Sequence, residues 1–358
     1  MSWFIAALQS AIILQSIFFI GVLLLQQKSE PGDRLHLSLL ALLCIHMLLN
    51  LQNSFHWLPQ LPVLTFGFGL WYGPLIYFYI QALIYQNFVW RSRDWLHFLP
   101  GLTLSLAVFG NVPMLWWSAG LTLLSMIVYV LLAALSYRRF TRTLRQTQSA
   151  EDQIAMRWAW RILQLNIVAV LLNLLNILLL VFTGQSALKL LAEVSMFLFL
   201  WLLVNILGIN GRTQHQLFAG ITAEDEVIAE QSSKTVPAEL SDERQQQIKT
   251  KLLSHMDGQK PYLDPMFNLQ MLGRQLGETP RYVSVVINQR LGQSFADFVN
   301  HYRLQQVKAC FADPLEQRTI LQIIYSCGFS TKSNFNRAFK QQEGTTPSAF
   351  RASLKRDT

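Results

Sequence analysis

Two segments near the end of the chain carry side chains of the kinds that contact DNA, at matching places in a repeated pattern. Each copy runs from one glycine to another, Gly277 to Gly292 and Gly328 to Gly344. Arginine and asparagine suit guanine and adenine edges, and lysine neutralises phosphate. The side chains predicted to point outward are Arg281, Ser284, Val285 and Asn288 in the first copy, and Lys332, Ser333, Asn336, Arg337 and Lys340 in the second. The pattern predicts two helix-turn-helix units that read DNA.

A short helix, a tight turn and a second helix must hold each set of side chains. In the first copy, Gly277 permits the turn and Thr279 caps the second helix. The apolar stripe of the first helix consists of Leu269, Leu272 and Leu276. Gly328 has the same place in the second copy. A helix over about 295–310 would join the units and place both reading helices on one face of DNA, about one helical turn apart.

The second copy resembles the C-terminal signature of AraC/XylS-type regulators. The residues that carry the resemblance are Gly328-Phe329, the run Ser333 to Lys340, Gly344-Thr345-Thr346-Pro347 and Phe350-Arg351. The resemblance covers about 245–353. It implies a transcription regulator that is not an enzyme and binds double-stranded promoter DNA, with RNA polymerase and a second copy of the chain as further partners.

Three positions depart from the family pattern. Gly273 and Ile324 replace alanines in the first helix of each unit, which would alter packing between helices. Val285 stands where relatives contact a base, and its side chain allows only apolar contact, such as with a thymine methyl group.

The first 210 residues read as membrane-spanning. The chain is 52% hydrophobic and 14% charged, and nearly all its long apolar runs lie in this part. About 20 mostly apolar residues span a bilayer. The seven candidate spans are 4–25, 36–53, 62–84, 96–111, 114–136, 162–183 and 187–208. Gly73-Pro74-Leu75-Ile76-Tyr77-Phe78-Tyr79 and His97-Phe98-Leu99-Pro100 resemble the seven-span part of a membrane-bound subgroup of the same regulators, which implies a bacterial cytoplasmic membrane.

The connections between these spans differ strongly in positive charge, which sets orientation. One side carries Lys28, Arg34, Arg91, Arg93, Arg138, Arg139, Arg142, Arg145, Arg157 and Arg161. The other side carries only Lys189. The bias predicts an N-terminus outside the cell and a C-terminal part in the cytoplasm, where DNA is found.

Polar residues inside the spans predict either hydrogen bonds between helices or a site for a signal molecule. These residues are His46, Asn50, Asn53, Asn166, Asn173, Asn176 and Glu193. In the first interpretation Glu193 would also pair with Lys189, one turn before it. In the second they line a polar cavity that opens outward and receives a small-molecule or membrane-derived signal.

The fold class predicted from these patterns is all-α. A seven-span bundle would occupy 1–212, an acidic flexible linker 213–240, and a cytoplasmic domain with two helix-turn-helix units 241–358. Its first helix is expected to begin at Ser241 and to stop at Gly258. The net charge of +8 fits nucleic acid and an anionic membrane surface.

Two other functions stay open for the membrane half. It could be a passive anchor, or an enzyme or transporter with a regulatory tail. The seven histidines show no clustering for a metal, no nucleophile motif or phosphate-binding loop occurs, and three cysteines fit no metal site. The sequence therefore predicts no cofactor, no metal and no catalytic residue.

Overall fold

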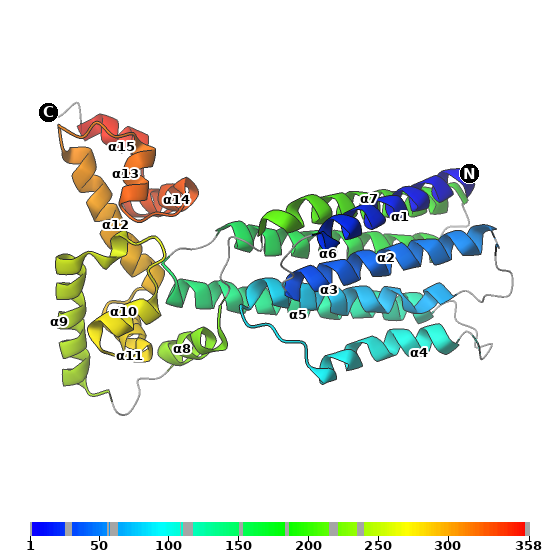
Figure 1. Ribbon diagram of the computed structural model, residues 1–358, viewed down its shortest axis with the longest axis horizontal. Coiled ribbons are helices and arrows are strands. Elements are labelled where there is room, and N and C mark those ends of the chain that lie inside the picture. The colour runs from blue at the N-terminus through cyan, green and yellow to red at the C-terminus, as the bar shows by residue number, and fades with distance from the viewer. Residues whose placement is uncertain are drawn as a thin grey trace. The chain divides into compact units, whose positions relative to one another are not determined.

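The computed structural model describes residues 2–25, 31–55, 57, 64–107, 109, 117–149, 153–182, 186–214, 221–234 and 240–354. Helices and their connections make up this part of the chain (Figure 1), and an isolated β-bridge joins Gln148 and Asn268. The predicted all-α class is confirmed. The chain divides into two compact units, Met1–Arg138 with Ile154–Gly220, and Arg139–Gln153 with Ile221–Thr358.

A helix lies at each of the seven positions where a span is predicted. These helices are α1 (Ser2–Leu24), α2 (Pro31–Phe55), α3 (Gly69–Ile84), α4 (Leu99–Ala107), α5 (Trp117–Thr147), α6 (Gln153–Phe182) and α7 (Ser186–Gln214). Five of them, α1, α2, α5, α6 and α7, are long and apolar enough to cross a membrane. The 16 residues of α3 and nine of α4 cover about 24 Å and about 14 Å. Both are shorter than a hydrocarbon core of about 30 Å, so the count of seven stays a prediction.

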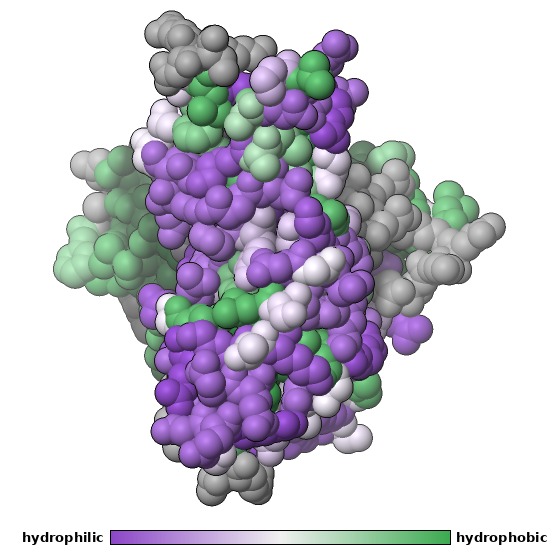
Figure 2. All heavy atoms as spheres, turned by 90° about the vertical axis from the view of Figure 1, so that its left-hand side faces the viewer, coloured by the Kyte–Doolittle hydropathy of each residue, from purple (hydrophilic) through white to green (hydrophobic). Residues whose placement is uncertain are grey.

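The outer surfaces of these helices are unusually apolar. Phe18, Leu131, Leu171 and Leu202 are each about half exposed or more, on α1, α5, α6 and α7. Water-soluble proteins rarely expose such contiguous apolar surface. Figure 2, by contrast, shows a mainly hydrophilic face of the second unit. The apolar surface of the first unit is compatible with insertion into a membrane.

Helices α1 and α7 approach closely and share a hydrogen-bonded pair inside the first unit. The amides of Gln15 and Asn205 exchange hydrogen bonds of 3.3 and 3.1 Å. A Cβ atom on Gly208 would lie 2.5 Å from the ring of Phe19. Small residues and side-chain amides are the usual means by which helices associate in lipid.

The second unit consists of short capped helices. They are α8 (Ala223–Lys234), α9 (Asp242–Gln259), α10 (Leu269–Leu276), α11 (Pro280–Val285), α12 (Phe295–Ala312), α13 (Ile320–Ser326), α14 (Lys332–Glu343) and α15 (Pro347–Leu354). A π-helical turn, Val286–Arg290, extends α11. Thr279 caps α11 and Gly277 has a φ of 64°, as predicted. Helix α9 begins after Ser241 but passes the predicted stop at Gly258 and ends at Lys260, which takes the left-handed conformation.

Helix α12 connects the two helix-turn-helix units by contributing to both cores. Its first half buries Phe295 and Val299 with the residues of α10 and α11. Its second half buries Val307 and Phe311 with those of α13 and α14. The predicted connecting helix is confirmed, because one continuous element packs against both units.

The predicted flexible linker contains a packed helix. Within 213–240, α8 buries Ile228 and Ala229, which are 5% and 4% exposed. Ile221, which precedes α8 in the chain, is fully buried as well. The prediction of flexible chain is wrong for α8, because these few apolar side chains were outweighed by the acidic composition around them.

Arg303 of α12 is the most connected buried charge of the second unit. Its Nε donates to the carbonyl of Tyr262 at 2.7 Å, and its Nη2 donates to the carbonyl of Asp264 at 2.8 Å. The guanidinium also donates to the Ser149 carbonyl and hydroxyl, at 3.3 and 3.0 Å. Burial lowers the pKa of Arg303 to about 10, against the opposing effect of Asp264. Arg303 therefore stays charged at neutral pH.

The turn of the second helix-turn-helix also packs on Arg303. Gly328 has a φ of 89°, and a Cβ atom there would lie 2.3 Å from the Tyr262 carbonyl oxygen and 2.9 Å from Arg303 Nε. The guanidinium carbon lies 5.9 Å from the ring centroid of Phe329. A glycine is thus required at this turn both for backbone conformation and for space.

Replacing Arg303 with methionine should destabilise the second unit by about 3 kcal/mol or more, because several buried carbonyl groups lose their donor. Hydrogen exchange at the amides of α10 and α12 in the full chain measures this as a lower opening free energy. Arg274→Met, which changes an exposed arginine of α10, is the control and should stay within about 0.5 kcal/mol. Equal effects of the two substitutions would contradict the role of Arg303.

Candidate nucleic-acid interface and membrane cavity

Helix α14 presents one polar face, held in place by two buried aromatic rings. Phe335 and Phe339 are fully buried and anchor the helix in its core. The predicted contacts of the second copy are all exposed: Lys332, Ser333, Asn336, Arg337 and Lys340. The prediction that they point outward is confirmed.

Three of these residues line a shallow hollow at the edge of the second helix-turn-helix. Lys332, Asn336 and Lys340 are four residues apart and therefore follow one face of α14. They share a hollow of about 350 Å³ with the start of α15, at Thr346 and Ser348. Two ammonium groups flanking an amide can hold phosphate oxygens on both sides of a base contact.

Arg337 lies beside a second arginine that the sequence interpretation used only for topology. Partial burial and the neighbouring Arg145 both lower the pKa of Arg337. Arg145 is exposed, near the end of α5, in the segment that belongs to the second unit. Two guanidinium groups repel each other when close, and a polyanion relieves that repulsion. Arg145 is therefore a further candidate contact with phosphate.

Arg351, part of the family-like signature, has a structural role. Its guanidinium donates to the carbonyls of Arg318 and Glu316, at 3.0 and 3.2 Å, and lies 5.4 Å from the ring centroid of Phe311. Hydrogen bonds with Arg318 lower the pKa of Glu316 to about 2, so this carboxylate stays charged beside it. Arg351 thus fixes the loop before α13 and is not free to reach DNA.

The first helix-turn-helix is different, because its reading helix is covered. Arg281 and Asn288 are half-buried, whereas Ser284 is 1% exposed and Val285 is fully buried. The prediction that Ser284 and Val285 point outward is wrong. Helix α8 packs against α11 (Figure 1), and Val285 lies in a buried cluster with Leu240 and with Ile248 of α9. The side chain of Asn288 donates to the hydroxyl of Ser284 at 3.2 Å.

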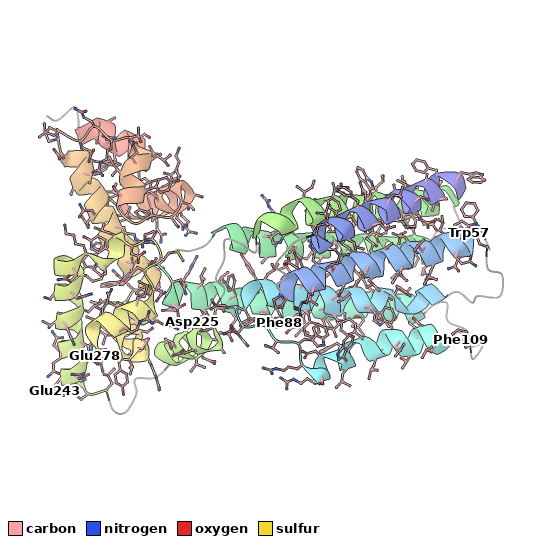
Figure 3. All side chains as sticks on the ribbon, viewed as in Figure 1. Trp57, Phe88, Phe109, Asp225, Glu243 and Glu278 are labelled. Atoms are coloured by element: carbon pink, nitrogen blue, oxygen red, sulfur yellow. The ribbon has the colours of Figure 1, made fainter. Side chains whose placement is uncertain are left out.

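Helix α8 is held on this unit by polar contacts as well as apolar ones. Asp225, 4% exposed, accepts hydrogen bonds from the backbone and the hydroxyl of Thr222, both at 2.9 Å. Asp225, which is labelled in Figure 3, also accepts one from the side chain of Gln270 on α10 at 3.5 Å.

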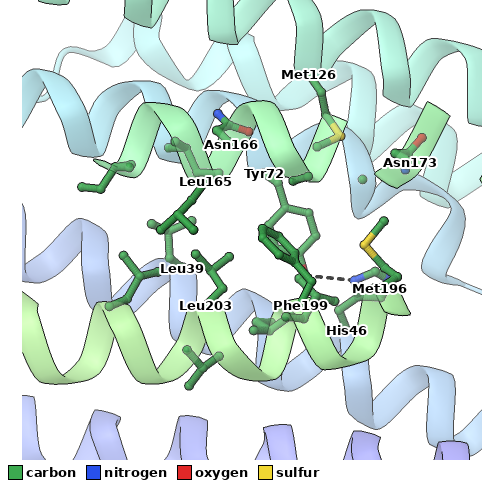
Figure 4. A pocket seen from close by; sticks show the side chains of 18 of the residues that line it. Leu39, His46, Tyr72, Met126, Leu165, Asn166, Asn173, Met196, Phe199 and Leu203 are labelled. Atoms are coloured by element: carbon green, nitrogen blue, oxygen red, sulfur yellow. Dashed lines mark hydrogen bonds between the residues drawn. The ribbon is translucent and has the colours of Figure 1, made fainter. Parts of the chain in front are cut away.

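The polar residues predicted inside the spans separate into two groups. His46, Asn166 and Asn173 line a cavity of about 210 Å³ within the first unit (Figure 4). Asn50, Asn176 and Glu193 are not among its lining residues.

The three residues away from the cavity have other surroundings. Asn176 donates to the carbonyls of Leu172 and Ala192, at 3.0 and 3.4 Å, as a hydrogen bond between helices requires. Asn50 is half-buried and Glu193 is exposed. The side chain of Lys189, the predicted ion-pair partner of Glu193, lies outside the described residues.

The cavity wall is apolar, which corrects the prediction of a polar cavity. Leucine, isoleucine, methionine and aromatic side chains from α2, α3, α5, α6 and α7 form most of it. The polar side chains of His46 and Tyr72 are paired with each other at 2.9 Å. The sequence predicted a continuous polar surface in this cavity. The structure instead has a few separate polar side chains in an apolar wall.

The comparisons with known proteins concern the second unit. Residues 272–353 match a family model described as a helix-turn-helix domain. This region is an AraC-type helix-turn-helix domain. A curated relative is the uncharacterized HTH-type transcriptional regulator YtdP of Bacillus subtilis (strain 168), 30% identical over 83 residues, which are 23% of this chain. The chain spans about a tenth of the length of that relative. No solved structure matches the chain.

Arg351→Ala should loosen the loop before α13 in the absence of DNA, because two carbonyls lose a charged donor. The expected cost is about 1–3 kcal/mol, measured by hydrogen exchange at 313–319 in the full chain. Arg351→Lys, which keeps the charge without the planar fork, should recover only part of it. Unchanged exchange in Arg351→Ala would contradict the structural role of this residue.

Proposed function

We propose that this protein is a membrane-anchored, sequence-specific transcription regulator, whose C-terminal domain binds promoter DNA and whose membrane domain detects a signal. The helix-turn-helix domain implies a DNA-binding regulator, which is typically not an enzyme. The observation that carries the proposal is the exposed face of α14, where arginine, asparagine and lysine stand together on a rigidly anchored helix.

Two adjacent major-groove segments would be read, over about 20 base pairs. Helix α12 packs into both cores and so sets the distance between α11 and α14. Residues 261–358 hold twelve Lys and Arg against seven Asp and Glu, so the positive charge lies in the domain proposed to meet phosphate. Of the predicted contacts, Arg337 and Asn336 would read bases and Lys332 and Lys340 would bind phosphate.

The membrane topology follows from the charge of the connections. The cytoplasmic side would hold ten Lys and Arg and the outer side one. Five or seven spans are both odd numbers, so either count separates the two ends of the membrane domain. The C-terminal domain would then face the cytoplasm of a bacterial cell.

A sensing membrane domain is favoured over a passive anchor by the cavity among its helices. A membrane domain that serves only as an anchor for the DNA-binding domain needs no internal cavity. Cavities also weaken the packing of a protein. Replacing residues 1–208 with an unrelated anchor tests this. Regulation that stays the same in every growth condition would support the anchor.

Arg337→Ala and Lys340→Ala should affect DNA binding differently. The target site is first selected from genomic fragments with the full chain in lipid nanodiscs. Arg337→Ala should weaken binding to this site by about 1–3 kcal/mol and binding to random DNA little. Lys340→Ala should weaken both and lower the salt dependence by about one phosphate contact.

The control is Lys249→Ala on α9, which carries none of the predicted contacts. Equal losses on target and random DNA in Arg337→Ala would exclude this residue from base reading. Failure of the unmodified chain to select any shared site would overturn the proposed function itself.

A further inference from the structure

The cavity in the first unit has leucines gathered on one side and a polar end on the other. In Figure 4, Leu39, Leu165 and Leu203 lie toward one side, with Asn166 beside them, and His46 and Asn173 lie toward the other. None of its lining residues is an aspartate, glutamate, lysine or arginine. An ion buried there would lack a countercharge, so a ligand must be neutral.

One polar atom at this end lacks a partner. The amide oxygen of Asn173 is buried and has no hydrogen-bond partner among the described residues. His46 and Tyr72 already satisfy each other. A hydroxyl group suits the free position, because it can donate to the amide oxygen and can also accept from the amide nitrogen.

The volume limits the ligand to a short chain. An apolar protein cavity of about 150 Å³ binds benzene, which has six heavy atoms. By that proportion, about 210 Å³ holds roughly eight to ten heavy atoms. Medium-chain aliphatic molecules have this size and the flexibility to fill the space between the leucines.

We infer that the cavity binds a neutral, medium-chain aliphatic alcohol, with its hydroxyl at Asn173 and its chain between Leu39, Leu165 and Leu203. Its role as the signal rests on the proposed function, whereas the binding itself does not.

The test uses the full chain in nanodiscs and a photoreactive diazirine analogue of 1-nonanol. Labelling should map to the lining residues of α2, α6 and α7, and 1-nonanol should compete at least tenfold better than nonane or nonanoate. Leu203→Trp, which fills the cavity, should abolish labelling. Asn173→Leu should lower competition by 1-nonanol about tenfold and leave nonane unchanged.

Asn176→Leu is the matched control, because Asn176 bonds to carbonyls and is not a lining residue. Labelling that persists in Leu203→Trp would overturn the inference. Equal competition by nonane and 1-nonanol would also overturn it, and would show that the cavity takes lipid chains. DNA selection with the same variants shows separately whether the regulator function stands.

A second inference comes from α8, which packs against α11, the reading helix of the first helix-turn-helix. Ser284 and Val285 stand at reading positions of that helix and are buried, whereas the reading positions of α14 are exposed. Residues 223–234 hold four acidic residues against Lys234 alone. Both the volume and the negative charge of α8 therefore oppose DNA at this unit.

The packing of α8 against the first helix-turn-helix can be reversed. A helix of 12 residues is marginal in water without packing, and α8 packs through a small set of side chains around Ile228. In the order of the described helices, α8 follows α7, the last of the apolar helices. Elements with few buried contacts open most readily in native proteins.

We propose that α8 is an autoinhibitory helix: while it covers α11, only α14 reads DNA, and its release allows both units to bind. The proposal rests on the proposed function. It places the coupling between the membrane domain and DNA in one short helix.

Ile228→Asp in the full chain should release α8. The expected result is at least tenfold tighter binding to the selected site, and a footprint that grows from one major-groove segment to two. Val227→Asp is the matched control, because it adds the same charge to the same helix at a position that is 51% exposed. Hydrogen exchange should rise in α8 and α11 of Ile228→Asp and stay unchanged in α13 and α14.

An unmodified chain that already protects two segments, or an Ile228→Asp variant with unchanged affinity and footprint, would overturn the inhibition by α8. If neither chain prefers any DNA sequence, the proposed function fails as well, and the two failures are thereby distinguished.

Discussion

The hydrogen bonds of Arg303 hold together the parts on which DNA reading would depend. A buried guanidinium must satisfy its donors, and here the acceptors are backbone carbonyls between α9 and α10, and Ser149 after α5. The turn of the second helix-turn-helix closes over the same group through Gly328. Because one planar group touches all of these segments, α12 cannot shift without breaking several bonds at once. The spacing of the two reading helices is therefore as rigid as this contact.

The two units show opposite patterns of burial. In the first unit, large apolar side chains are exposed and a few amides join helices inside, as with Gln15 and Asn205. In the second, phenylalanines are buried and the basic groups of α14 are exposed. The cavity adds an unfilled apolar space to the membrane unit, and the covered α11 adds an inaccessible reading face to the other. A signal that changes the first unit would need a physical link to the second unit. Helix α8 is the first helix of the second unit after α7 in the chain.

The two helix-turn-helix units share a sequence pattern but differ in how far their reading helices are exposed. Both have a capped reading helix, a turn glycine and an apolar anchor. The first helix-turn-helix differs because α8 packs on it. In this packing, Ile228 of α8 is buried in the core of the first helix-turn-helix. A valine at position 285 suits this covered state, since it can pack on protein in one state and on a thymine methyl in another.

The sequence by itself determined the features that depend on neighbouring residues. Thr279 caps its helix, Gly277 makes its turn and the stripe of Leu269 and Leu272 is buried, because caps, turns and helical periodicity act within a few residues. The apolar helices of the membrane half were equally predictable from composition, although not their lengths.

The tertiary structure alone decided which faces stay open. Arg303 and Ser149 are 154 positions apart, and Gln270 and Asp225 are 45 apart. Such contacts leave little trace in local pattern, so α8 was read as flexible linker and Val285 as exposed. The cavity likewise needs side chains from five helices, which no single helix pattern contains. Burial is a property of the partner segment as much as of the residue, and only the folded chain brings the two together.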